Sequence, residues 1–110
     1  MSQLSEEELD YAFSALADPV RRRIVARLST GPATVKELTE LFPITKQAVS
    51  KHIAVLTDAG LITRSRDGQR RPCHLDPAVL EAMTGWLDNY RLAAEQQFRR
   101  LDDVLKNMED

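Results

Sequence analysis

The sequence predicts a mainly α-helical fold with one small β-hairpin, in the element order α-α-α-α-β-β-α. Three observations lead to this expectation: helix N-cap signals recur along the chain, apolar residues recur every three or four positions, and the period shortens to two only around Asp67-Gly68. A chain of 110 residues is long enough for one hydrophobic core but not for two. We therefore expect residues 1–110 to form a single domain.

Two helices are predicted in the first third of the chain. Residues 5–17 open with a capping box at Ser5 and continue with apolar residues at helical spacing. Asp18 and Pro19 then supply an N-cap and a proline at the first helical position, where its missing N–H is not needed. The second helix is expected to end at Gly31.

Residues 34–60 predict two short helices joined by a tight turn. Thr34 opens a second capping box, and Thr45 is a natural N-cap for a helix that runs to about Ala59. Gly60 lies where a helix commonly ends on a left-handed residue. This spacing is typical of a helix-turn-helix. The side chains expected to point inward from its first helix are Val35, Leu38 and Leu41.

Residues 61–75 predict a hairpin, or wing, with short strands over 61–66 and 71–75 on either side of Asp67-Gly68. The last helix is predicted over 77–108, again after an Asp-Pro pair. Its apolar residues alternate in steps of three and four along its whole length. Together these elements predict a winged helix-turn-helix.

The charge of the chain is unevenly distributed. The formal net charge is −2, yet residues 44–75 carry six basic and two acidic side chains. The segments before and after this region have an acidic excess. A local basic face is what neutralisation of phosphates requires, so the middle of the chain is the candidate DNA-binding region.

The predicted fourth helix has two different faces. Val49, Ile53 and Leu56 share one face and are expected to pack on the preceding helices. The other face carries hydroxyl, amide and ammonium groups near the helix N-terminus, which suits a recognition helix in the major groove. The candidate DNA-binding residues of this helix are Thr45, Lys46, Gln47, Ser50, Lys51 and His52. An ordinary solvated helix face is the alternative interpretation.

The predicted wing is rich in arginine. Its candidate DNA-binding residues are Arg64, Arg66, Gln69, Arg70 and Arg71, opposed only by Asp67. Arginines here can lie along phosphates or reach into the minor groove. The alternative is a charged edge that protects a small hairpin from aggregation, which needs only one or two such residues.

Several segments together resemble the ArsR/SmtB family of winged-helix repressors. They are Asp18-Pro-Val-Arg-Arg-Arg-Ile-Val, Thr34-Val-Lys-Glu-Leu, Gln47-Ala-Val-Ser-Lys-His-Ile-Ala-Val-Leu-Thr-Asp-Ala-Gly-Leu-Ile and the arginine-rich wing. The resemblance spans roughly residues 9–76. It implies a homodimer whose first and last helices form the interface, and repression of an operon that often includes the repressor's own gene.

The last helix independently favours a dimer. Its apolar stripe runs farther than a small winged domain could cover, and its large aromatic side chains are unfavourable in water. The interface is therefore expected between the helices over 5–17 and 77–108. The candidate interface residues are Leu9, Phe13, Trp86, Tyr90, Phe98, Leu101 and Leu105. A monomer whose last helix folds back on its own chain is the alternative. A two-fold dimer would predict a palindromic operator.

The metal ligands found in many members of that family are missing here. No cysteine pair stands in the third helix, and no histidine stands in the last one. We therefore expect no bound metal and no cofactor. The sequence also has no nucleophile–base motif and no glycine-rich loop, so we expect no enzymatic activity. Cys73 is expected to be an inward, inert thiol, although Arg71 and His74 nearby leave open an oxidisable one.

Two further functions stay open from the sequence. One is a repressor that responds to a metal, an oxidant or a small molecule; the other, of a different class, is a winged-helix module that binds a protein. The acidic start of the chain and the absence of a long apolar run predict a cytoplasmic protein that does not enter the membrane. We expect double-stranded DNA and a second copy of the chain as partners.

Overall fold

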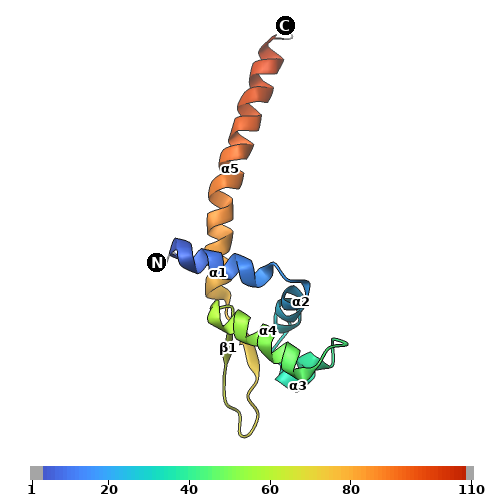
Figure 1. The fold of residues 1–110 in the computed structure, drawn as a ribbon. Coiled ribbons are helices and arrows are strands. Elements are labelled where there is room, and N and C mark those ends of the chain that lie inside the picture. The colour runs from blue at the N-terminus through green and yellow to red at the C-terminus, as the bar shows by residue number, and fades with distance from the viewer. Residues whose placement is uncertain (1–3, 109–110) are drawn as a thin grey trace.

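The computed structural model describes residues 4–108 and confirms the predicted element order (Figure 1). Residues 1–3 and 109–110, which the single-domain prediction also includes, lie outside the described residues. The elements are α1 (Glu6–Leu16), α2 (Pro19–Leu28), α3 (Val35–Thr39), α4 (Lys46–Asp58), β1 (Ile62–Arg64), β2 (Cys73–Leu75) and α5 (Pro77–Met108). None of these helices is long and apolar enough to cross a membrane.

The N-cap signals explain where the first four helices begin. In each case a side-chain oxygen accepts a hydrogen bond from a backbone N–H of the first turn, which otherwise has no partner. The four cap residues are Ser5, Asp18, Thr34 and Thr45. The caps of α1 and α3 are complete capping boxes. The helix starts were therefore predictable to within one residue.

Gly60 ends the α4 segment in the left-handed conformation, with φ of 78°. A Cβ at this position would lie 3.0 Å from Cγ2 of Val79 at the start of α5. The backbone conformation therefore favours glycine, and a side chain here would also have to displace Val79. This sharp turn sends the chain directly from α4 into β1.

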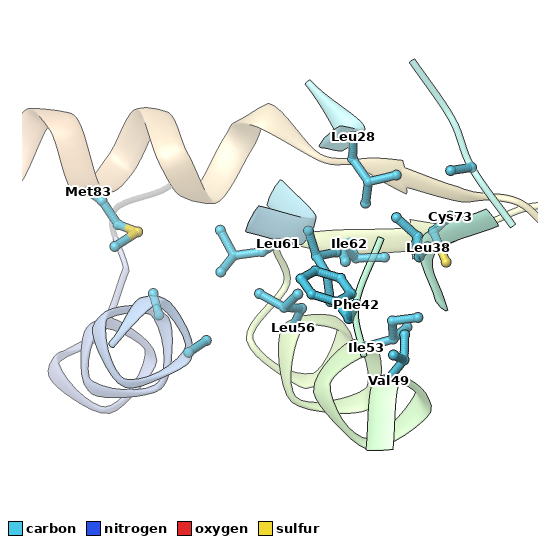
Figure 2. Close-up of a cluster of buried hydrophobic side chains, with 14 of the residues drawn as sticks. Leu28, Leu38, Phe42, Val49, Ile53, Leu56, Leu61, Ile62, Cys73 and Met83 are labelled. Atoms are coloured by element: carbon cyan, nitrogen blue, oxygen red, sulfur yellow. The ribbon is translucent and has the colours of Figure 1, made fainter. Parts of the chain in front are cut away.

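The hydrophobic core lies between α4, the hairpin and the first three helices (Figure 2). Val49, Ile53 and Leu56 of α4 point into it, as predicted, and all three are buried. Leu61, directly before β1, and Ile62, the first residue of that strand, are also buried. One core thus holds the fourth helix and the base of the wing in a single body.

The wing is a two-stranded antiparallel hairpin in which Ile62 pairs with Leu75 and Arg64 with Cys73. Its strands are shorter than the predicted segments 61–66 and 71–75. Pro72 has no N–H to donate, so the regular ladder stops beside it. Only isolated backbone bonds continue toward the tip, including the reciprocal pair between Asp67 and Arg70.

The prediction that Leu41 points inward is wrong. Helix α3 ends at Thr39, so the following residues leave the helical periodicity, and Leu41 is 40% exposed. Phe42 fills the core position instead and is only 8% exposed. The guanidinium of Arg23 lies 4.8 Å from the centre of the Phe42 ring, which places a cation over the aromatic face.

Helix α5 continues well beyond the compact part of the molecule (Figure 1). Its 32 residues correspond to about 48 Å at 1.5 Å per residue. Met83 is its only buried residue and points toward α1 (Figure 2). Beyond Met83 the large apolar side chains of the helix are exposed: Trp86, Leu87, Tyr90, Leu92, Phe98, Leu101, Val104, Leu105 and Met108.

Two leucines three residues apart test this packing. We expect Leu38→Ala to lower the free energy of unfolding by about 2–5 kcal/mol, because it leaves a cavity at a fully buried site. Leu41→Ala is the matched control and should change it by less than about 1 kcal/mol. Urea unfolding at one fixed protein concentration measures both. Equal losses would contradict the outward placement of Leu41.

Candidate nucleic-acid interface

The exposed face of α4 carries the polar side chains that the sequence singled out. Lys46, Gln47, Ser50 and Lys51 are all exposed in the first two turns of the helix, whereas Val49, Ile53 and Leu56 are buried. The salt bridges found in residues 4–108 involve neither lysine. We call Lys46, Gln47, Ser50 and Lys51 the reading face. Thr45 differs from them because its hydroxyl oxygen caps the helix by accepting from the backbone N–H of Ala48 at 3.1 Å.

His52 lies at the margin of this helix but faces α2 instead of open solvent. It is half-buried, and its Nδ1 is 3.1 Å from Nη1 of Arg21 and 3.9 Å from Oδ1 of Asp18. Because a guanidinium has only donors, Arg21 donates and His52 Nδ1 accepts. The sequence did not single out Arg21, since nothing in the local pattern relates two residues 31 positions apart.

The wing arginines fall into two groups. Arg64 folds across the hairpin and donates to the carbonyl oxygen of Arg71 from Nε at 3.2 Å and from Nη2 at 2.8 Å. Arg70 donates from Nη2 to Oε1 of Glu37 at 3.0 Å. Arg66, Gln69 and Arg71 are exposed at and beside the tip of the hairpin.

Glu37 ties the wing to the helix-turn-helix. Its Oε1 accepts from the backbone N–H of Thr34 at 3.1 Å, from the hydroxyl of Thr34 at 3.0 Å, and from Arg70. The backbone N–H and the hydroxyl of Thr34, and then the charge and hydrogen bond of Arg70, hold the pKa of this carboxyl below its usual value. The sequence signal for Glu37 was only its capping box, so its contact with the wing was missed.

The reading face and the wing belong to the same end of the molecule. The α3–α4 unit and the hairpin lie away from the free C-terminal end of α5 (Figure 1). A helix can enter the major groove of DNA, and a short arginine-rich hairpin can lie along the phosphates or in the minor groove beside it. This end therefore combines a polar surface suited to base edges with cations suited to phosphates.

Cys73 is buried in the strand that closes the wing, as predicted. Burial raises the pKa of its thiol, and the charge of Arg64 opposes this shift only in part. His74 points away from the core, and its Nε2 lies 2.7 Å from the hydroxyl oxygen of Ser65. Within residues 4–108, no three His, Cys, Asp or Glu side chains gather in a way that could hold a metal ion.

The candidate interface residues all lie on α1 or α5, and all but one are at least partly exposed. The Phe13 ring meets Trp86 edge-on at 5.5 Å between ring centres, and Trp86 contacts Tyr90 at 4.8 Å. Tyr90, Phe98, Leu101 and Leu105 are at least half exposed. Leu9 is the exception: it is 8% exposed and packs in the core of its own protomer, because it lies on the inner face of α1.

Comparisons with known proteins agree with this architecture. The model of the family described as "Helix-turn-helix domain" matches residues 16–65. The chain is 42% identical over 94 residues to the HTH-type transcriptional regulator Rv2034 of Mycobacterium tuberculosis, covering 86% of this chain and 88% of that protein. It is 33% identical to the transcriptional repressor SdpR of Bacillus subtilis, over 74% of this chain and 91% of that protein.

A solved structure gives the same result in three dimensions. The crystal structure of an ArsR family transcriptional regulator superimposes with a TM-score of 0.77 and 37% identity. The superposition covers 86% of this chain and 97% of that one, so it includes a large part of α5 as well as the winged domain.

The burial of Cys73 has a measurable consequence. Only the thiolate attacks disulfide reagents, and both burial and the raised pKa suppress it in the folded protein. We expect the native protein to react with an aromatic disulfide at about pH 7.5 only as fast as it opens, and denaturant to accelerate the reaction by orders of magnitude. A rapid stoichiometric reaction without denaturant would contradict an inert thiol and support an oxidisable one.

Proposed function

The chain belongs to the ArsR family of winged helix-turn-helix proteins and is a DNA-binding transcriptional regulator, and we propose that it works as a homodimeric repressor that occupies a palindromic operator. Regulators of this kind are not enzymes. Its place of action would be the cytoplasm, where the DNA is. The observation that carries the proposal is the end of the molecule where the reading face and the arginines of the wing stand together.

The two parts of this surface would have different tasks. The reading face would enter the major groove, where Gln47 suits an adenine edge and the lysines suit guanine or phosphate. Thr45 and His52 would position the helix. The wing would bind phosphates or the minor groove through Arg66, Gln69 and Arg71, which are free to reach outward. Arg64 and Arg70 would first have to leave their contacts with the hairpin and Glu37.

A second copy of the chain is proposed as the partner of α1 and α5. The pair of rings formed by Phe13 and Trp86 leaves Trp86 38% exposed, and the apolar stripe continues along α5 to Leu105. A contiguous apolar surface of this length on a single helix is typical of an association surface. The expected stripe comprises Phe13, Trp86, Tyr90, Phe98, Leu101 and Leu105.

A two-fold dimer would present two reading faces to one side of a duplex. Half-sites about 34–36 Å apart would then be read as an inverted repeat, since the symmetry of the operator mirrors that of the protein. A dimer bound across a promoter would exclude the polymerase, so we propose repression. The repressor's own gene is a natural target for such a protein.

Gln47 tests the placement of the reading face. Selection of bound duplexes from a random pool should recover an inverted repeat with the wild-type protein. Gln47→Ala should lose the preference at one base pair in each half-site, a discrimination of about 1–3 kcal/mol. The matched control is Gln96→Ala on the exposed surface of α5, which should recover the wild-type motif. An unchanged motif from Gln47→Ala would show that the reading face is elsewhere.

Leu101 tests the proposed dimer. Leu101 is 54% exposed, so the variant Leu101→Glu should leave the protomer folded. It should shift the protein to monomers in analytical ultracentrifugation, because the charge would have to be buried at the contact. Gln96→Glu introduces the same charge on another side of the helix and should remain dimeric. A wild-type monomer at micromolar concentration would refute the proposal directly.

A further inference from the structure

One hydrogen-bonded junction joins α1, α2 and α4. At its centre is the guanidinium of Arg21, which donates to three groups. Nε donates to the carbonyl oxygen of Ala15 at 2.6 Å, and Nη2 to that of Ser14 at 3.2 Å. Nη1 donates to Nδ1 of His52 at 3.1 Å. A single side chain therefore connects the last turn of α1 to the middle of α4.

The junction adds side-chain donors at the C-terminus of α1, where the backbone N–H of Ala17 already donates to the carbonyl oxygen of Ser14. The last turn of α1 has no basic residue, and the carbonyls at a helix C-terminus need donors. Arg21 supplies two of these donors, and Arg22 supplies a third by donating to the carbonyl oxygen of Leu16 at 2.8 Å. Arg21 is consequently held in place by α1, and its Nη1 group has a defined direction toward α4.

The contact with His52 requires one protonation state. Arginine cannot accept a hydrogen bond, so Nδ1 of His52 must carry its lone pair, and the neutral ring must have its proton on Nε2. A proton on Nδ1 would remove this acceptor and place two cations side by side. The nearest acceptor would then be Oδ1 of Asp18, now 3.9 Å away.

The charged groups that face the His52 ring come from the start of α2. They are the carboxylate of Asp18 and the guanidinium of Arg21, while Lys51 precedes His52 on its own helix. Asp18 already accepts from the backbone N–H groups of Val20 and Arg21 at 2.8 and 3.1 Å. The hydrogen bond from the backbone N–H of Arg21 is the main cause that holds the pKa of Asp18 below its usual value, and that from Val20 adds to it. The carboxylate therefore stays charged beside the ring.

We propose that Arg21 and His52 are positioning residues that hold α4 against the α1–α2 corner, and that protonation of His52 breaks this link and weakens specific DNA binding. The proposal rests on α4 being the helix that reads DNA. Ser50 and Lys51 of the reading face directly precede His52, so a change of partner at His52 displaces the side chains that would meet the bases. Nδ1 of His52 can accept from Arg21 only without a proton, and it can donate to Asp18 only with one. Protonation therefore moves the ring from Arg21 toward Asp18.

The first test observes the link itself in the wild-type protein. The nitrogen and proton shifts of the imidazole identify its tautomer in a spectrum recorded at about pH 7.5. We expect His52 to carry its proton on Nε2. A proton on Nδ1 would overturn the proposal, whatever the DNA measurements show.

The second test compares the affinity for the selected operator with that for a scrambled duplex at the same pH. This ratio removes the general attraction of a protonated protein to DNA. Between about pH 8 and about pH 6.2 it should fall for the wild type, because a proton on Nδ1 of His52 removes the acceptor for Arg21. His52→Asn places an amide oxygen near the position of Nδ1 and cannot be protonated. The ratio for His52→Asn should therefore be the same at both pH values.

Two controls complete the experiment. His52→Leu should lower the ratio about five- to tenfold at both pH values, the order expected for the loss of a typical intramolecular hydrogen bond. His74→Asn removes the other histidine of the chain and should retain the wild-type pH dependence. A wild-type pH dependence in His52→Asn would refute the proposal. An unchanged motif from Gln47→Ala would instead refute the reading face, and the tautomer result would still stand.

Discussion

The structure depends on the burial of one face of α4. Val49, Ile53 and Leu56 are almost completely removed from water, and the first wing strand and the preceding helices pack around them. At about 25 cal/mol for each Å² of apolar surface, these contacts outweigh the weak preference of any single helix in isolation. Because the same core buries Leu61 and Ile62, the reading face and the base of the wing are held in one rigid relation.

Polar contacts add direction to this packing. The wing reaches α3 through Arg70 and Glu37, and α4 reaches the α1–α2 corner through His52 and Arg21. The exposed Arg70–Glu37 pair contributes little to stability, so it matters for orientation more than for folding. One face of α4 thus packs on the hydrophobic core, and the charged side chains of α4 remain exposed and available to a polyanion.

Most of helix α5 does not take part in this hydrophobic core. Its first turns pack on the core through Met83, and the rest carries a stripe of large apolar side chains into solvent. Within residues 4–108, no other segment of the protomer covers these side chains. A second α5 has the matching surface, and its symmetry would also provide the second reading face that an inverted repeat needs.

The sequence by itself determined the elements and the buried face of α4, because caps, glycine turns and apolar periods act over a few residues. Thr45, Gly60 and the stripe of α4 needed no tertiary context. Only the tertiary structure decided that Leu41 faces outward and Leu9 inward, since helix ends and neighbouring surfaces set those positions. It also decided the partners of His52 and Arg70, which are 31 and 33 residues away along the chain. Local patterns carry no information about such distant contacts.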